Sequence, residues 1–454
     1  MTAGRHSRRQ IHLAAHVPGA DGTTVWADPR SRSQIAFSSF EHLARTAERG
    51  CFDFLLLAEG LRLREHKGRI HDSDVVGRPE SLTVLNALAA VTGRIGLAAT
   101  VDATFSEPYE LARRLATLDH LSGGRAAWNV GTSSDALTGE NFRRGGYLDR
   151  ADRYPRAAEF IDVARELWDS WTPDGVPRPI AHRGRHFDIA GEFTVPRSPQ
   201  GYPVVIQAGA SGEGRECAAR TADVLFSRWG DGSCPPGGHS TPQGALEDGR
   251  AFYADVKGRL AKYGRDPDDL RIMPGVSVVL GDTAAEAQER AAEIRRQQVS
   301  PQNALLALER LWGTDLSSYD PDGPFPDVDP VPDPALGQGG TRRADTVARA
   351  EKWRALSREK GLSIRQTMIE ASPRQSFIGT PEAVAADLET VVRQDAADGF
   401  VLVPHLTPGG LDEFVDRVVP LLQERRAFRT EYRGTTLRSH LGLPDPAWTG
   451  RPAG

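Results

Sequence analysis

An alternation of short apolar runs with longer helical stretches constrains the fold of this chain more than any other feature. Each run is bounded by turn residues, and in each longer stretch apolar residues recur at three- and four-residue steps. This alternation is typical of βαβ units that build a parallel sheet. Eight runs predict strands, at residues 11–16, 52–58, 95–100, 126–130, 204–207, 224–227, 272–279 and 400–403. Eight strand–helix units are the number in a closed (β/α)8 barrel, so we expect an α/β fold with that architecture.

The stretches between these runs carry the pattern of amphipathic helices. Residues 40–49 read FEHLARTAER and residues 109–120 read YELARRLATLDH, and each sequence gathers its apolar side chains on one helix face. Residues 156–168 and 411–422 follow the same pattern. Because barrels of this kind routinely exceed 250 residues as one unit, we expect a single barrel domain over residues 1–454.

One segment interrupts this rhythm after the seventh predicted strand. Residues 280–378 contain a charged helical stretch at 282–297, followed at 317–340 by a sequence whose proline and aspartate density does not support a buried element. We interpret the segment as an insertion that forms a mobile cap or lid. A separate small domain is the alternative, but two helices around a proline-rich loop offer too little core to fold alone.

The barrel pattern resumes after the insertion. GTPEAVAADL predicts a helix with Thr380 at its N-cap and Pro381 at its first position. The eighth strand and its helix follow, which leaves residues 424–454 as a C-terminal extension.

Composition and charge exclude several classes of protein. The 56 Lys and Arg against 61 Asp and Glu give a net charge of −5, and the cations are scattered, so we expect no nucleic-acid or membrane partner. No apolar run approaches the ~20 residues that span a bilayer, and the first residues lack a signal-peptide pattern. Cys51, Cys217 and Cys234 form no CxxC pair, which argues against disulfides or a thiolate metal site. We therefore expect a soluble cytoplasmic protein.

Candidate functional residues directly follow the predicted strands, because the active site of such a barrel lies at the carboxyl ends of its strands. Most of them form hydrogen bonds, and few are nucleophiles. They are His16 and Trp26 after the first strand, Glu59 after the second, Thr100 and Asp102 after the third, and Asn129, Thr132 and Ser133 after the fourth.

The strongest local signal is the sequence QAGASGEGRECAARTAD after the fifth strand. Its glycines let a ligand approach the backbone, the start of the following helix offers free N–H groups, and Ser211 adds a hydroxyl, so a phosphate would fit there. An ordinary turn in which Ser211 only caps the helix is equally compatible with the pattern. The GxGxxG dinucleotide fingerprint is not matched.

A cationic stretch, LDRADRYPRAAEF at 148–160, follows the fourth predicted strand. It places Arg150, Arg153 and Tyr154 just before a predicted helix. Arg150, Arg153 and Tyr154 in it could reach a phosphate. Alternatively, Arg153 forms a surface ion pair with Asp149 or Asp152.

Other patterns are less specific. His66 and His71–Asp72 have no third ligand at helical spacing, so we predict no metal site. No GxSxG nucleophile motif follows any strand. Trp128 and Trp229 either stack on a planar ligand or fill the layer around the barrel.

Longer stretches resemble a known family. LAATVDATFSEPYELARRLATLDHLSGGRAAWNVGTSS at 97–134 resembles the signature stretch of the bacterial-luciferase-like flavin monooxygenases. Residues 152–160, 182–226, 379–388 and 398–443 also match, so the resemblance covers nearly the whole chain. The more similar branch is that of nitrilotriacetate monooxygenase, dibenzothiophene-sulfone monooxygenase and pristinamycin synthase.

This resemblance implies a two-component monooxygenase. Such an enzyme binds FMN that a separate NAD(P)H:flavin reductase has reduced, uses O2 as co-substrate, and transfers one oxygen atom to a small organic molecule. A heterocycle, an amine or sulfur compound, or a natural-product intermediate would be candidate substrates. A deazaflavin-dependent hydride-transfer enzyme and a non-catalytic flavin-binding subunit are the alternatives. The family also implies a homodimer or homotetramer, to which residues 82–90 and 111–118 are expected to contribute apolar surface.

The matching motifs assign roles to single residues. Thr100 and Asn129 are expected at the flavin ring or its chain, and Tyr154 and Ser211 at the phosphate. His16 and Asn129 are the candidates for a catalytic role. The full set of expected cofactor contacts is Glu59, Thr100, Asn129, Arg150, Tyr154, Ala210, Ser211 and Gly212.

The sequence also departs from the family at three places. Glu59 stands where the family usually has Asp, and Arg150 where His is frequent. The loop at 17–26 lacks the paired histidines common after the first strand, which leaves His12 and His16 as poor substitutes. These changes suggest a substrate that differs from those of the well-known relatives.

Overall fold

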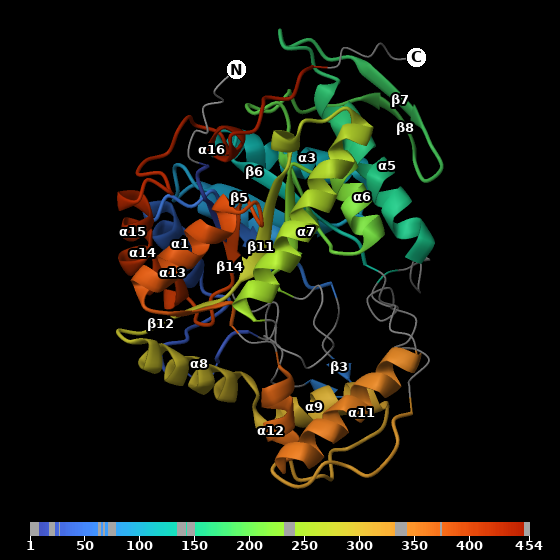
Figure 1. Ribbon diagram of the computed structural model, residues 1–454. Helices are drawn as coiled ribbons and strands as arrows, with labels where there is room; N and C mark the ends of the chain where they lie inside the picture. Colours follow the sequence, from blue (N-terminus) through green and yellow to red (C-terminus); the bar gives the residue numbers. More distant parts are fainter. Residues whose placement is uncertain are drawn as a thin grey trace.

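A closed barrel of eight parallel strands forms the centre of the computed structural model, in the order β1-β14-β11-β10-β9-β6-β5-β2 (Figure 1). The structure describes residues 9–17, 23–26, 28–61, 65–66, 69–70, 79–133, 142, 150–230, 241–331, 343–372 and 375–448. The barrel strands are β1 (His12–His16), β2 (Phe54–Leu57), β5 (Gly96–Asp102), β6 (Ala126–Gly131), β9 (Val204–Ala208), β10 (Val224–Arg228), β11 (Arg271–Val276) and β14 (Gly399–Leu402). The predicted (β/α)8 barrel is therefore confirmed, and each of the eight predicted strands overlaps one of these barrel strands.

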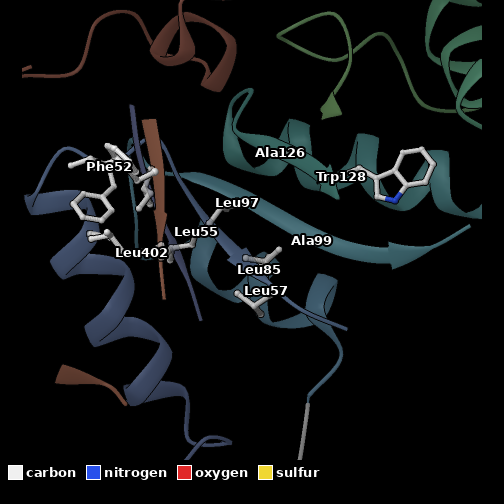
Figure 2. Packing of buried hydrophobic residues seen from close by; sticks show 14 of the residues in the cluster. Phe52, Leu55, Leu57, Leu85, Leu97, Ala99, Ala126, Trp128 and Leu402 are labelled. Carbon is white, nitrogen blue, oxygen red and sulfur yellow. The ribbon is translucent and has the colours of Figure 1, made fainter. Parts of the chain in front are cut away.

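Helices surround the barrel and cover the outward faces of its strands. They are α1 (Phe37–Arg49), α2 (Ser81–Ala89), α3 (Pro108–Ser122), α5 (Arg150–Asp169), α6 (Gly212–Thr221), α7 (Pro242–Leu260), α13 (Pro381–Arg393), α14 (Asp412–Arg417) and α15 (Val419–Glu424), with the 3-10 turns η1 (Ala261–Tyr263), η2 (Pro267–Asp269) and η3 (Gly409–Leu411). Outward residues such as Leu55, Leu57, Leu97 and Ala99 pack in one buried cluster with residues of these helices (Figure 2).

The single helix predicted at 411–422 is wrong. It is divided between α14 and α15, because Pro420 has no N–H to donate within a helix and therefore lies in the first turn of the second one. Thr380 is the N-cap of α13 as predicted, and its side chain accepts a hydrogen bond from the Ala383 N–H.

The inward residues of the strands form a separate core inside the barrel. Ala14, Phe54, Ala98 and Val224 belong to it, and each is fully buried. Side chains alternate along a strand, so the residues two positions further on also point inward. This alternation determines which side chains the carboxyl ends present to a ligand.

The C-terminal extension closes the amino-terminal end of the barrel. Leu437 and Leu441 of α16 (Leu437–Leu441), with Leu443, belong to the inner core. The Leu437 N–H donates to the carbonyl of Gly124, which lies just before β6. Arg438, also in α16, forms a buried ion pair of 2.9 Å with Asp223, which precedes β10.

The insertion begins where the seventh strand leaves the barrel. The predicted strand at 272–279 was too long, because β11 ends at Val276 and residues Val278–Leu280 form β12, which pairs in parallel with β13 (Phe377–Gly379) outside the barrel. Between β12 and β13 lie α8 (Ala284–Gln298), α9 (Pro301–Trp312), α11 (Arg343–Lys360) and α12 (Ile364–Ala371). The insertion helices α9, α11 and α12 lie at the opposite end of the molecule from α16 (Figure 1).

The insertion holds more helices than the two that the sequence predicted. Residues of α9, α11 and α12 bury their own cluster, in which Trp312 stacks on Trp353 with ring centroids 6.5 Å apart. The Trp312 Nε1–H donates to the Val328 carbonyl (2.8 Å), which fastens the proline-rich loop to this cluster. The helix α8 packs against Val25, in the loop after β1, and so lies at the carboxyl end of the barrel.

Two short hairpins complete the structure. The strands β3 (Glu65–His66) and β4 (Arg69–Ile70) pair antiparallel, as do β7 (Pro179–Arg183) and β8 (Asp188–Glu192). Within the described ranges, no helix is both long enough and apolar enough to cross a membrane.

The apolar surface expected for oligomerisation is not found at 82–90 and 111–118. Leu82, Leu85, Leu111 and Leu115 are buried in the chain's own core, because α2 and α3 turn these faces toward β5 and β6. They cannot contact a second copy.

Replacing Arg438 with alanine should destabilise the protein by about 3 to 5 kcal/mol, because it leaves Asp223 buried without its counter-charge. Chemical denaturation measures this change. Arg433→Ala, an exposed arginine in the same segment, is the matched control and should change the free energy of unfolding by less than about 0.5 kcal/mol. Equal stability of the two variants would contradict the role of Arg438.

The C-terminal extension also contains a histidine, His440 in α16, that should make the protein less stable in acid. Burial, with Arg429 nearby, lowers the pKa of His440 from its ordinary 6.5 to about 4. Between these values the unfolded chain binds a proton that the folded chain does not, so stability falls as the pH falls through this window, by roughly 3 kcal/mol in full.

Unfolding free energies measured across this pH window should therefore fall less steeply in His440→Gln than in the wild type. His120→Gln, which changes an exposed histidine, should keep the wild-type slope. Identical slopes in all three proteins would rule out His440 as the source.

Candidate active site

The carboxyl ends of the strands form a floor of polar, aromatic and small residues. The inward positions there are His16, Thr100, Asn129 and Phe226, two residues beyond inward members of the inner core. The rings of His16 and Phe226 stack with centroids 6.4 Å apart and planes 18° apart, although β1 and β10 are not neighbours. They therefore meet across the barrel. Gly275 makes room for Phe226, since a Cβ there would lie 2.9 Å from its ring.

Thr100 and Asn129 lie side by side on β5 and β6, where they are partners in the strand register. The Asn129 Nδ2–H donates to Thr100 Oγ1 (3.0 Å), which fixes the orientation of the amide. Asn129 is only 7% exposed, and its Oδ1 has no hydrogen-bond partner among the described residues. An unpaired buried acceptor is costly, so this oxygen is suited to accept a hydrogen bond from a ligand.

Tyr154 and Ser211 meet at the start of α6. The Tyr154 hydroxyl and Ser211 Oγ are 3.5 Å apart, and Ser211 Oγ accepts a hydrogen bond from the Gly214 N–H (3.1 Å). A Cβ on Gly214 would lie 3.1 Å from the Tyr154 hydroxyl and 3.2 Å from Ser211 Oγ. Ser211 is thus the N-cap of α6, and glycine keeps the space beside both hydroxyls open.

Ala210 and Gly212 flank Ser211 at this turn. Both are exposed, and the carbonyl of Ala210 accepts a hydrogen bond from Arg215 Nε (2.9 Å). Nothing lies within 4 Å of a Cβ built on Gly212. The main chain at the helix start is therefore accessible from solvent, as a phosphate site requires.

The cationic stretch that was predicted to precede a helix instead forms the first turns of α5, and it is only partly described. The Arg153 guanidinium lies over the Tyr154 ring, 4.6 Å from its centroid, while Asp152 pairs with Arg185 at 2.6 Å. Arg150 begins α5, but its side chain lies outside the described residues, as does Asp149. Arg153 thus adds positive charge at the Tyr154 hydroxyl.

Glu59 and Asp102 lie together at the ends of β2 and β5. The Asp102 N–H donates to Glu59 Oε2 (3.0 Å). Burial raises the pKa of Glu59 to about 7, and the nearby charge of Asp102 adds to this effect. A carboxyl group that can hold a proton at neutral pH is therefore present beside Thr100.

Two polar residues at strand ends escaped the sequence interpretation. His405 lies three residues after the end of β14, and burial together with Arg30 and Arg290 lowers its pKa to about 4, so its ring is neutral. A polar residue shortly after a predicted strand was the signal that made Glu59 a candidate, and the same signal could have identified His405. Gln207, at 1% exposure on β9, has an Nε2 without a partner among the described residues.

Other candidates lie away from this site. Trp128 is fully buried and donates from Nε1 to the Val101 carbonyl (3.0 Å), and Trp229 stacks on Phe377, so both fill the layer around the barrel. His12 contacts Asp53 at the amino end of β1 (3.3 Å), which excludes it from the site.

The residues that the sequence offered as possible metal ligands lie wholly or partly outside the described residues. His71 and Asp72 lie outside the described residues, as does the side chain of His66. In the part of the chain that the structure describes, no group of three or more His, Cys, Asp or Glu residues is arranged to hold a metal ion.

Comparison with known proteins identifies the family. Residues 14–399 match the model of the luciferase-like monooxygenases. The chain belongs to this family. It is 40% identical to nitrilotriacetate monooxygenase component A of Aminobacter aminovorans, with 92% of each chain covered. It is 38% identical to N-acetyl-S-(2-succino)cysteine monooxygenase of Bacillus subtilis (strain 168), over 97% of this chain and 98% of the relative.

A solved structure agrees with this assignment. A riboflavin lyase with modified FMN and riboflavin superposes with a TM-score of 0.76 at 26% identity, with 96% of each chain covered. The predicted family, its nitrilotriacetate monooxygenase branch and the enzyme class are thus confirmed. This luciferase-like monooxygenase is a flavin-dependent enzyme that acts on a small organic substrate, and the two alternatives are not favoured.

The site of this luciferase-like monooxygenase fits a flavin nucleotide. The free Asn129 Oδ1 suits a ring N–H, and the space that Gly214 leaves beside two hydroxyls at a helix start suits a phosphate. These observations concern this chain alone and do not depend on the relatives.

Gly214→Ala should weaken FMN binding roughly tenfold, because the added methyl displaces the two hydroxyls that hydrogen-bond a charged group. The thermal midpoint should not fall, since alanine favours the helix by about 1 kcal/mol. Fluorescence titration measures the affinity. Gly258→Ala, at a position of α7 where a Cβ meets nothing within 4 Å, should bind FMN as the wild type does. Equal affinity in both variants would contradict the phosphate site.

Proposed function

We propose that this enzyme binds FMN reduced by a separate flavin reductase and uses O2 to oxygenate a small organic molecule. The observation that carries the proposal is the Tyr154–Ser211 hydroxyl pair at the start of α6, at the same barrel mouth as the free amide oxygen of Asn129. When bound, reduced FMN supplies the electrons that activate O2 for transfer of one oxygen atom.

The chain's own residues would bind and orient the cofactor. Tyr154, Ser211 and the N–H groups at the start of α6 would hold the phosphate, as the positive end of the helix favours an anion there. Thr100 and Asn129 would orient the ring, and Glu59 would lie at its edge. The Thr100–Asn129 hydrogen bond keeps the amide in place before the cofactor arrives, which lowers the cost of binding.

The insertion would exclude water from the reaction. Its first helix, α8, is tied to the barrel by Arg290, which forms hydrogen bonds to both carboxyl oxygens of Glu413 in α14 (3.2 and 3.1 Å). The helices beyond it have their own core and can move as a unit against this anchor. A lid of this kind protects a reactive oxygen species until substrate is present.

The relatives support the partner and substrate class. One is named a monooxygenase component A, which favours a separate reductase for this chain as well. Both relatives are named for molecules that carry an amine or thioether with several carboxylates, so we infer an amine or sulfur compound as substrate. We also place the enzyme in the cytoplasm, as a homo-oligomer, on the strength of the family.

Anaerobic titration with reduced FMN tests the proposal. Ser211→Ala and Tyr154→Phe should each weaken binding by roughly tenfold, the loss of one hydrogen bond to a charged group. Ser300→Ala, which removes the N-cap of α9, and Tyr109→Phe, at an exposed tyrosine, are matched controls and should bind as the wild type does.

Turnover supplies the second part of this test. We expect the enzyme to form product from at least one member of a panel of amines and thioethers. Product formation should require both oxygen and reduced FMN. Tight binding of a deazaflavin without oxygen consumption would overturn the proposal in favour of hydride transfer. If no flavin bound, the cofactor assignment itself would fail.

A further inference from the structure

The carboxyl pair Glu59–Asp102 lies at the mouth of the barrel, on the strands next to Thr100 and Asn129. The strand β2 pairs with β5, and β5 pairs with β6, so three adjacent strands place Glu59 just after β2, Asp102 at the end of β5 and Asn129 on β6. Because FMN would occupy this mouth, an inference about the pair rests on the proposed function.

The hydrogen bonds around the pair are unequal. Asp102 accepts from the Thr104 N–H at Oδ1 (2.7 Å), and at Oδ2 from the Ser133 N–H (3.0 Å) and the Ser133 hydroxyl. Glu59 accepts from the Asp102 N–H (3.0 Å). Hydrogen bonds to a carboxylate stabilise its charged form. Asp102 is therefore the member of the pair built to carry the negative charge.

Among the residues that the structure describes, the groups that face Glu59 from neighbouring elements do not compensate a second charge. Asp102 approaches from β5 and Glu80 from the N-cap of α2, and both are acidic. The cation that faces it is Arg114 of α3, which pairs with Glu80 at 2.9 Å and lies 3.9 Å from Glu110. With its charge shared among these carboxylates, Arg114 offers little stabilisation to an ionised Glu59.

A neutral carboxyl and a carboxylate behave differently toward a bound flavin. The neutral group can donate its O–H to a carbonyl or ring nitrogen, whereas the carboxylate can only accept. FMN carries a phosphate, and its reduced ring adds negative character, so a second negative charge at the mouth opposes binding.

We propose that Glu59 retains a proton beside the ionised Asp102, and that this proton makes the binding of reduced FMN depend on pH. In the protonated state the Glu59 hydroxyl donates to the flavin. When the pH rises, the proton passes to solvent, the Asp102–Glu59 pair becomes doubly negative, and the cofactor binds less tightly. The raised pKa of Glu59, about 7, puts this change within the physiological range.

The dissociation constant of reduced FMN, measured anaerobically from about pH 6 to about pH 8.5, tests this proposal. Over this range the affinity of the wild type for reduced FMN should fall roughly tenfold relative to that of Glu59→Gln. This is the effect expected of one added negative charge several ångströms away at an effective dielectric constant near 20. Ionisation of FMN itself contributes equally to both proteins and cancels in the ratio. Glu247→Gln, which changes an exposed carboxylate of α7 that takes no part in this cluster, should keep the wild-type profile.

Infrared spectra of the protein without flavin give an independent readout. A carboxylic C=O band should disappear as the pH rises through about 7 in the wild type and be absent in Glu59→Gln. A second buried carboxyl, Asp119, has a pKa that burial raises to about 6, so the variant is needed to assign the band. Glu59→Asp, which keeps a carboxyl, is the second variant and should retain a titrating band.

The possible failures are distinct. If the wild type binds no flavin at any pH, the proposed function fails. If flavin binds but Glu59→Gln has the wild-type pH profile, the role of Glu59 fails while the function stands. Absence of the titrating infrared band in both the wild type and Glu59→Asp would overturn the proposal even if Glu59→Gln did not fold.

Discussion

Closure of the barrel at its amino-terminal end is the constraint on which the rest of this structure depends. Asp53, Asp223 and Asp398 precede β2, β10 and β14, and each accepts a hydrogen bond from a main-chain N–H of the neighbouring strand (2.8–2.9 Å). Buried cations compensate each of them, and two of these cations, Arg429 and Arg438, come from the C-terminal extension. Because α16 also fills the inner core, a ligand can enter only at the opposite end.

The open end differs because several of its inward positions carry small residues. Ala58 follows the inward Leu56 of β2, Ala208 follows the inward Ile206 of β9, and Gly275 leaves the space that the Phe226 ring occupies. A planar ring can lie on such a floor without a cavity inside the barrel. The insertion enters from the same end, since β12 continues directly from β11. The barrel therefore brings together this floor, the proposed phosphate site at the start of α6, and the insertion.

The sequence predicted the barrel well, because each strand repeats an apolar pattern that packing on both faces requires. It failed where local pattern and tertiary structure disagree. The run Val278–Leu280 is as apolar as a barrel strand, yet it pairs with residues 377–379, a partner that no local pattern reveals. Ser211 was visible as an N-cap, but its approach to Tyr154 joins residues 57 positions apart. Such a contact exists only once α5 and α6 pack side by side, which is why the residues alone left the phosphate site open.

The buried carboxyl groups that precede barrel strands differ from the carboxyl group that follows β2. The fully buried Asp53 and Asp398, before β2 and β14, have charged and main-chain partners. At the carboxyl end, Glu59 is buried next to another acid, and the inward Asn129 has an Oδ1 without a partner among the described residues. Both features reduce stability, and a fold tolerates such costs where a ligand supplies the missing interaction. The acidic surroundings of Glu59 and the unpaired oxygen of Asn129 therefore both indicate a ligand site at the carboxyl end of the barrel.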